Sequence, residues 1–155
     1  MHIRILGAGL AGCEAALYLA SRGFAVELCE QKPLRFSPAH HSANFAELVC
    51  SNSLKADRVD SASGLLKAEM RLLGDRLLDA AERCRVAAGG ALAVDRDAFS
   101  AAVTQLVEEQ PLIRVVRGEV TRADEGGPDT RTLVATGTLT DGALAADIAR
   151  LTGGA

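Results

Sequence analysis

The sequence predicts an α/β protein in which helices cover both faces of a parallel sheet. Apolar, β-branched runs of strand length alternate along the chain with segments whose apolar residues recur at helical spacing. The composition is 48% hydrophobic with 15 glycines, which suits many short turns between strands and helices. With 155 residues the chain is long enough for one compact domain and too short for two ordinary ones.

The N-terminal part of the chain predicts a strand, a helix and a second strand. Residues 3–6 form a short apolar run, and apolar residues then recur at helical spacing from Leu10 until Gly23, a natural helix stop. Residues 24–30 alternate as a second buried strand, bounded by Gly23 and Pro33. This order is that of a βαβ unit.

A long segment at about residues 33–60 follows no period. Prolines, a histidine pair and several Asn and Ser residues interrupt every helical or strand pattern there. An irregular segment of this length inside a compact domain is usually functional or disordered, so we expect a functional loop.

The rest of the chain returns to regular patterns. Apolar residues recur at helical spacing over residues 61–84, with a break at Gly74, and predict a helical layer that faces the core. Asp95 is expected to cap a helix that Pro111 ends. Strands are expected at residues 91–94, 113–120 and 132–136, and a last helix at 144–151.

A glycine-rich turn joins the first strand to the first helix and matches the pattern G-x-G-x-x-G. The first glycine permits a tight turn, the second lets the backbone approach a pyrophosphate, and the third lets the helix pack closely on the strand. The start of the helix then offers free N–H groups and partial positive charge to phosphates. The residues expected to hold the pyrophosphate are Gly7, Ala8, Gly9, Leu10, Ala11 and Gly12.

The context of this motif indicates a Rossmann-like dinucleotide site. Glu30 ends the second strand 21 residues after Gly9, where an acidic side chain is expected to bind ribose hydroxyls. An acidic residue at this position disfavours a ribose that carries a phosphate. The alternative is that the glycines serve only a tight turn.

The choice between FAD and NAD depends on a later segment. Residues 133–137 read Leu-Val-Ala-Thr-Gly, and this strand with its Ala-Thr-Gly end resembles the one that flavoproteins of the glutathione-reductase type place beside FAD. Small residues there allow the backbone to approach a ligand. Val120, Thr136 and Gly137 complete the expected FAD site. An ordinary strand followed by a glycine turn is the alternative.

Three further segments are unusual. Residues 38–41 read Pro-Ala-His-His and residues 45–55 read Phe-Ala-Glu-Leu-Val-Cys-Ser-Asn-Ser-Leu-Lys, while residues 89–96 read Gly-Gly-Ala-Leu-Ala-Val-Asp-Arg. Together with residues 7–12 and 135–137, they resemble the folate- and FAD-dependent tRNA (uracil-C5) methyltransferases, which act on the T-loop uridine. The resemblance runs in order over the whole chain, and the segment around Cys50 is its most discriminating part.

The spacing of the four cysteines fits neither a zinc knuckle nor a CxxC redox pair and indicates a reducing, cytoplasmic setting. The resemblance implies a flavoenzyme that takes a methylene group from methylenetetrahydrofolate and reduces it with FADH2, which NAD(P)H regenerates. Its RNA partner is tRNA. Because members of that family are much longer, the resemblance also implies that residues 1–155 are a partial FAD-binding domain of glutathione-reductase type, truncated at the C-terminus. Such a fragment alone is expected not to methylate tRNA.

Cys50 is the expected catalytic residue. Carbon 5 of uracil becomes nucleophilic when a thiolate adds to carbon 6, so this chemistry needs an activated cysteine. By resemblance Cys50 is one of two functional cysteines, and attack on the base, proton handling and protection of the flavin remain open as its role. The alternative is a buried, inert thiol, as expected for Cys13, Cys29 and Cys84.

Four other polar side chains are candidates for ligand contacts. Lys32 is expected to reach the adenosine ribose or a phosphate, although an arginine is more usual there in the family, and Arg96 is expected to meet a phosphate. The His40–His41 pair lacks the further ligands that a zinc site requires, so no metal is expected.

Charge and composition limit the partners. The net charge of −3 and 3% aromatic residues do not make the basic, stacking surface typical of nucleic-acid binding, so RNA contacts must be local or lie elsewhere. No apolar run reaches the ~18 residues of a membrane span. We expect neither DNA nor a membrane as partner. Two alternative functions are a flavoenzyme of tRNA wobble-uridine modification and a nucleotide-binding module without catalysis.

Overall fold

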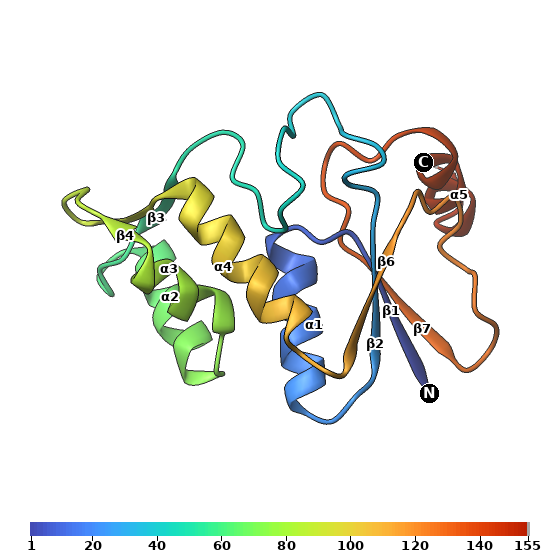
Figure 1. The fold of residues 1–155 in the computed structure, drawn as a ribbon, viewed down its shortest axis with the longest axis horizontal. Helices are drawn as coiled ribbons and strands as arrows, with labels where there is room; N and C mark the ends of the chain where they lie inside the picture. The colour runs from blue at the N-terminus through green and yellow to red at the C-terminus, as the bar shows by residue number, and fades with distance from the viewer. Residues whose placement is uncertain (155) are drawn as a thin grey trace.

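The computed structural model describes residues 1–154, and a four-stranded parallel sheet lies at its centre (Figure 1). The strand order is β6-β2-β1-β7. Ile5 of β1 pairs with Leu28 on one side and Leu133 on the other. The strands are β1 (His2–Leu6), β2 (Val26–Glu30), β6 (Ile113–Arg117) and β7 (Thr130–Val134). The predicted α/β class with a parallel sheet is confirmed.

One face of the sheet packs against α1 (Leu10–Ser21) and α4 (Arg96–Glu108), and α3 (Arg76–Arg83) packs on these two helices. Alternate strand residues point to this side, and burial of each such side chain stabilises the fold by about 1.5 to 3 kcal/mol. The main core between sheet and helices includes Ile3, Ile5, Leu17, Val26, Leu28, Phe99, Val103 and Ile113.

The opposite face carries α5 (Gly142–Leu151) at the carboxyl ends of the strands. Leu144 of this helix packs with Leu6 and Cys29 of the sheet. Nearer the amino ends of the strands, Arg4 pairs with Glu27 at 3.2 Å and with Glu125 at 2.9 Å. Helices therefore lie on both sides of the sheet, as predicted (Figure 1).

A small second sheet lies in the long connection between β2 and β6. Its order is β3-β5-β4, formed by β3 (Ser53–Ala56), β4 (Arg85–Val86) and β5 (Ala91–Val94), and both pairings are antiparallel. The prediction of strand 91–94 is confirmed, but its expected place among the alternating parallel strands is wrong. Only residues 87–90 join β4 to β5, and so short a link permits a hairpin but no parallel crossover.

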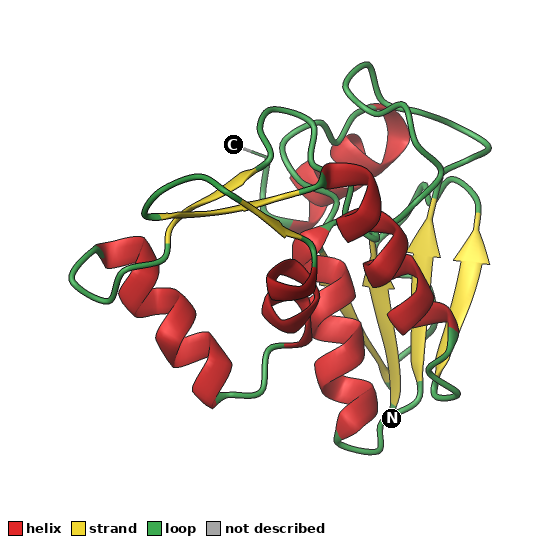
Figure 2. Ribbon diagram, turned by 60° about the vertical axis from the view of Figure 1, so that its left-hand side comes forward, coloured by secondary structure: helices red, strands yellow, loops and turns green. Residues whose placement is uncertain are grey.

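The helix α2 (Ala62–Leu72) corrects the prediction of one core-facing helical layer over residues 61–84. Of the apolar residues that carry the predicted spacing, Leu66 of α2 is 55% exposed and Leu73, just beyond the helix, is 68% exposed. Figure 2 shows α2 standing apart from the helices that pack on the central sheet. Gly74, with φ +87°, turns the chain so that α3 buries Leu77 against the core. The prediction therefore holds for α3 and is wrong for α2.

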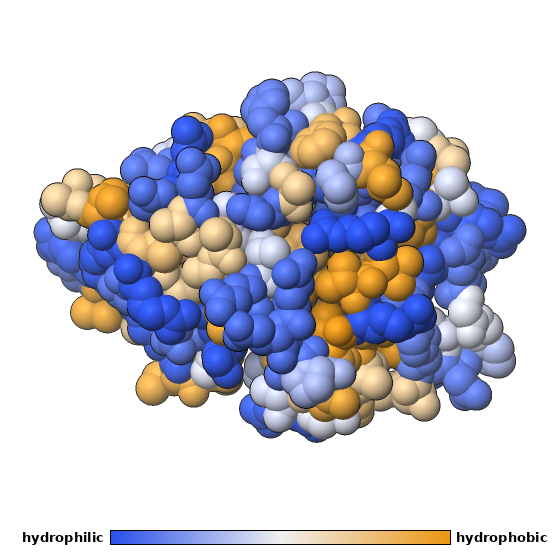
Figure 3. All heavy atoms as spheres, viewed as in Figure 1, coloured by the Kyte–Doolittle hydropathy of each residue, from blue (hydrophilic) through white to orange (hydrophobic). Residues whose placement is uncertain are grey.

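The surface seen in Figure 3 is mostly hydrophilic, with apolar residues gathered over the region of β6, the edge strand of the central sheet. No helix among residues 1–154 is both long and apolar enough to cross a membrane.

The long loop is anchored at its middle. Phe45 is fully buried, its N–H donates to Thr104 Oγ1 at 2.8 Å, and the Arg117 guanidinium lies 4.3 Å from the centre of its ring. The loop is therefore an ordered wall of the domain.

Two glycines allow α1 to meet the sheet closely. A Cβ on Gly12 would lie 1.8 Å from the carbonyl oxygen of Gly7, and a Cβ on Gly7, with φ +97°, would lie 2.7 Å from that of Ala135. Nothing lies within 4 Å of a Cβ placed on Gly9. The predicted turn and packing roles of Gly7 and Gly12 follow from these contacts.

A matched pair of alanine variants tests this packing. Gly12→Ala forces the helix away from the Gly7 backbone and is expected to cost about 2 kcal/mol or more. Gly9→Ala has room for its methyl group and is expected to cost less than about 1 kcal/mol. Urea unfolding measures both. Equal losses in the two variants would contradict the packing role of Gly12.

Candidate functional site

A pocket of about 360 Å³ opens at the carboxyl ends of β1, β2 and β7. Ligands of open α/β sheets bind at this end of the strands. The walls of the pocket come from residues 6–11 of the glycine-rich turn, segment 29–40, residues 118–120 and residues 135–141, with Val49 and Leu144.

The start of α1 offers free backbone N–H groups to this pocket, whereas the two N–H groups before it are bonded within the protein. The N–H of Gly7 donates to Cys29 O and that of Ala8 donates to Glu30 Oε2, both at 2.8 Å. Gly9 is the N-cap of α1 and has no side chain to cap the helix. The N–H groups of the first helical turn have no partner within the helix, and they carry the positive end of its dipole. The arrangement suits an anion.

Glu30 is buried beside the turn. Its Oε2 accepts the Ala8 N–H at 2.8 Å and its Oε1 accepts the Lys32 N–H at 2.9 Å. Each carboxylate oxygen retains acceptor capacity after one hydrogen bond. The side chain therefore shapes the turn and also lines the pocket, and its contact with ribose stays a prediction.

Lys32 makes contacts that differ from those predicted. Its side chain is buried, and Nζ donates to Asn44 O at 2.6 Å and pairs with Glu47 Oε2 at 3.3 Å. The ammonium group thus fixes the long loop; Lys32 also lines the pocket, and its contact with ribose or phosphate stays a prediction. The sequence offered no sign of the pairing with Glu47, because the carboxylate partner lies 15 residues away.

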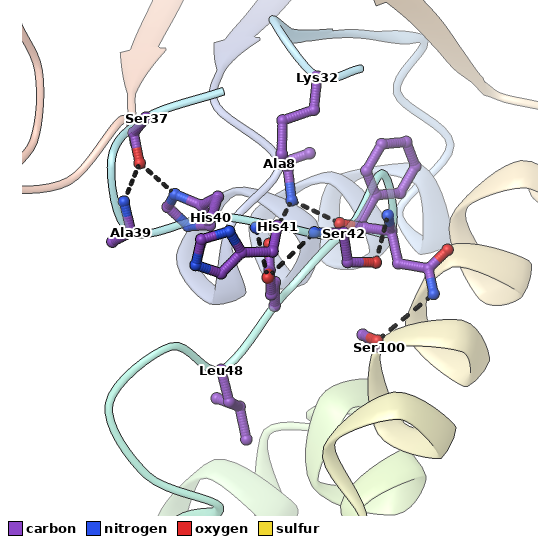
Figure 4. Close-up of polar contacts among 12 residues, drawn as sticks. Ala8, Lys32, Ser37, Ala39, His40, His41, Ser42, Leu48 and Ser100 are labelled. Atoms are coloured by element: carbon purple, nitrogen blue, oxygen red, sulfur yellow. Dashed lines mark hydrogen bonds and ion pairs between the residues drawn. The ribbon is translucent and has the colours of Figure 1, made fainter. Parts of the chain in front are cut away.

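Glu47 organises the histidine segment of the loop, whose residues His40, His41 and Ser42 are seen in Figure 4. Its Oε1 accepts the N–H groups of His41 at 2.9 Å and Ser42 at 3.1 Å. Burial alone would raise the pKa of Glu47, but the hydrogen bonds from His41 and Lys32 outweigh it and hold the pKa below its usual range. Glu47 is therefore a charged clamp within the loop.

Ala8 links the loop to the glycine-rich turn. Its carbonyl oxygen accepts the Ala46 N–H at 2.9 Å and the Cys13 thiol at 3.3 Å. Burial, with the Glu30 charge, raises the pKa of Cys13 to about 12. Cys13 is thus a neutral, buried thiol, as predicted.

Cys50 is exposed on the loop, directly after Val49, which lines the pocket. The prediction that it differs from the buried thiols Cys13 and Cys29 agrees with this exposure, while its catalytic role stays a prediction. Of the histidine pair, His40 lines the pocket and its Nδ1 lies 2.5 Å from Ser37 Oγ. Within residues 1–154 no group of three or more His, Cys, Asp or Glu side chains is arranged to hold a metal.

The remaining predicted residues divide into two sets. Val120, Thr136 and Gly137 line the pocket with residues 7–11. Arg96 does not, because it begins α4 and faces Asn52 and Val94 in a separate hollow, with Nη1 3.5 Å from Leu48 O. Arg96 therefore lies outside the lining of this pocket, and its contact with a phosphate stays a prediction.

Three charged residues of the pocket were not predicted: Arg35, Glu119 and Asp141. Arg35 bonds both oxygens of Asp141 at 3.0 Å and also pairs with Glu119. Of these three residues, only Asp141 has a signal in the sequence, because an aspartate just before an apolar segment of helical spacing is typical of a helix N-cap.

Comparison with known proteins identifies the family. The family model described as glucose inhibited division protein A matches residues 2–154. The chain belongs to this family. Its fold is similar to that of GidA from Aquifex aeolicus in a form II crystal, with a TM-score of 0.62 at 16% identity over 79% of this chain and 20% of that chain.

Curated relatives of this family member carry a methyltransferase name. The chain is 58% identical to methylenetetrahydrofolate--tRNA-(uracil-5-)-methyltransferase TrmFO of Koribacter versatilis (strain Ellin345), over 99% of this chain and 34% of the relative. It is 54% identical to the TrmFO of Geotalea uraniireducens (strain Rf4), over 97% of this chain and 34% of that relative. The chain thus spans about a third of their length.

The Glu47 clamp predicts a pH dependence. A carboxylate with a lowered folded pKa stabilises the fold above its unfolded pKa, about 4.3, and loses this contribution as pH falls through the folded value. Glu47→Gln is therefore expected to lower the free energy of unfolding by about 1 to 3 kcal/mol at pH 7. Urea unfolding between pH 3 and 7 should show this difference shrinking below about pH 4. A difference that is constant with pH would contradict the clamp.

The cysteines are expected to differ in reactivity. The thiolate is the nucleophile, so iodoacetamide at about pH 8 should modify exposed Cys50 well before Cys13, whose pKa is raised to about 12 by burial. Peptide mass spectrometry after short exposure measures this, with Cys50→Ser as control. Modification of Cys13 before Cys50 would show that the core around α1 opens more readily than the structure implies.

Proposed function

We propose that this chain is the FAD-binding N-terminal portion of a folate-dependent tRNA (uracil-5-)-methyltransferase. The observation that carries the proposal is the start of α1, whose unpartnered N–H groups line a pocket beside Glu30 and the Thr136–Gly137 turn. The identity of 53–58% to relatives of that name supports the same activity.

The residues of the pocket suit a flavin dinucleotide. Gly9, Leu10 and Ala11 would receive the pyrophosphate on their N–H groups, and the open space beside Gly9 permits the approach. Glu30 would accept hydrogen bonds from ribose hydroxyls. Val120, Thr136 and Gly137 would line the further part of the cofactor.

In the complete enzyme the reduced flavin supplies the electrons that convert a transferred methylene group to methyl, with methylenetetrahydrofolate as carbon donor and NAD(P)H as reductant. From this chain, Cys50 contributes a thiol to the reaction. Lys32 and Glu47 hold its loop against the glycine-rich turn, so that the thiol stays near the cofactor pocket. The four free thiols favour a reducing, cytoplasmic setting.

FAD binding is the first test. The purified chain is expected to bind FAD, and Gly9→Ala is expected to weaken binding by about tenfold, or 1.4 kcal/mol, because its methyl group enters the space of the pyrophosphate. Quenching of flavin fluorescence measures the affinity. The control Gly90→Ala adds a methyl group outside the pocket, where its nearest neighbour lies at 3.5 Å. Failure of the parent chain to bind FAD, or equal binding by both variants, would contradict the proposed site.

The activity itself is tested in an enzyme that contains this chain as its N-terminal third. Cys50→Ala is expected to abolish transfer of labelled carbon from methylenetetrahydrofolate to tRNA while FAD binding is retained. Cys84→Ala, at a half-buried thiol that is the C-cap of α3, is the matched control. Unchanged turnover of the Cys50 variant would refute its catalytic role.

A further inference from the structure

An ion-pair cluster lies on the rim of the proposed cofactor pocket. Its members are Arg35 of the long loop, Glu119 after β6 and Asp141 at the start of α5, and all three line the pocket. The side chains are 40%, 47% and 65% exposed, respectively. This rim cluster joins segments that are far apart in the sequence. The contacts proposed above for FAD do not involve its charges.

The charges of the pocket present a difficulty for an anionic ligand. Glu30, Glu119 and Asp141 line it, and the lysines and arginines among its described lining residues are Lys32 and Arg35. The ammonium of Lys32 is buried in the loop on Asn44 and Glu47. A pyrophosphate would therefore meet more negative than positive side chains unless Arg35 turned to it.

Arg35 is suited to such an exchange. Exposed ion pairs contribute little to stability, so its bonds to Glu119 and Asp141 are readily given up. Its guanidinium already binds carboxylate oxygens through two nitrogens, because Nη2 lies 3.0 Å from both oxygens of Asp141 and Nη1 pairs with Glu119. The same fork matches two oxygens of a phosphate.

Asp141 has an alternative partner near by. It occupies the N-cap position of α5, where an aspartate normally accepts N–H groups of the first turn, yet its side chain makes no cap hydrogen bond. Its backbone is extended, with φ −135° and ψ −177°, as capping requires. Release from Arg35 would let its carboxylate rotate onto the N–H of Ala143 or Leu144.

We propose that Arg35 is a pyrophosphate-binding residue of this site, held by Glu119 and Asp141 until the dinucleotide arrives. Ligand binding transfers the guanidinium to the phosphates, and Asp141 then caps α5. Because Leu144 of α5 packs on Leu6 and Cys29, the cap forms directly against the pocket. This inference rests on the proposed dinucleotide function. It adds a positively charged side chain to the contacts proposed above for the phosphates.

Calorimetric titration of the chain with FAD and with ADP tests the exchange. Arg35→Gln is expected to raise both dissociation constants about tenfold or more and to make them less sensitive to salt. Arg35→Lys keeps the charge without the fork and should fall between. Asp141→Asn frees Arg35 but still caps a helix, so it should bind both ligands severalfold more tightly. Arg83→Gln, at an exposed arginine of α3 outside the pocket, controls for net charge.

Hydrogen exchange of the Leu144 amide reports the second half of the proposal. Addition of ADP should slow this exchange in the parent chain and not in Asp141→Ala. Equal FAD affinity of Arg35→Gln and Arg83→Gln, or unchanged exchange at Leu144, would overturn the inference while the proposed function stands. If neither the parent chain nor Arg83→Gln binds FAD, the proposed function and this inference fail together.

Discussion

The peptide groups of Ala8 connect the parts of this molecule on which the site depends. Its N–H donates to Glu30 at the end of β2, and its carbonyl oxygen accepts the N–H of Ala46 from the long loop. One residue thus holds the central sheet, the start of α1 and the Cys50 segment in a common position. An unpaired buried peptide group is costly, so loss of either partner would leave the turn without support.

This arrangement leaves a defined set of groups for a ligand. The N–H groups of Gly7 and Ala8 donate to Cys29 and Glu30 of β2, and the N–H groups at the helix start from Gly9 onwards remain free. Lys32, which stands close in sequence to Glu30, is used to hold the loop. The positive charge directed at the pocket therefore comes from backbone dipoles and, in our proposal, from Arg35.

The sequence predicted the site best where one local pattern had one structural solution. The spacing of three glycines between an apolar run and a helical period required the tight turn and the close packing that Gly7 and Gly12 show. Helical periodicity, by contrast, reports that a helix has an apolar face and does not say what covers it. Leu66 of α2 has the right spacing, yet it is exposed because α2 packs beside β3 and away from the central sheet.

Contacts between distant residues account for the remaining differences. Lys32 finds its carboxylate in Glu47, and Arg35 finds Asp141 across 106 positions of sequence, so neither pairing follows from local spacing. Strand 91–94 was correctly predicted, but its antiparallel partners depend on the hairpin from β4. The chemical character of single residues could therefore be predicted from the sequence, whereas the distant residues that they contact could not.

The central claim is that a dinucleotide places its phosphates at the start of α1. Two-dimensional amide NMR spectra of the labelled chain, recorded during titration with FAD, test it most directly. We expect the largest changes in amide chemical shift at Gly9, Leu10 and Ala11. The claim would be contradicted by unchanged signals there, with the largest shifts instead at Leu66, Met70 and Leu73 in the apolar groove between α1 and α2.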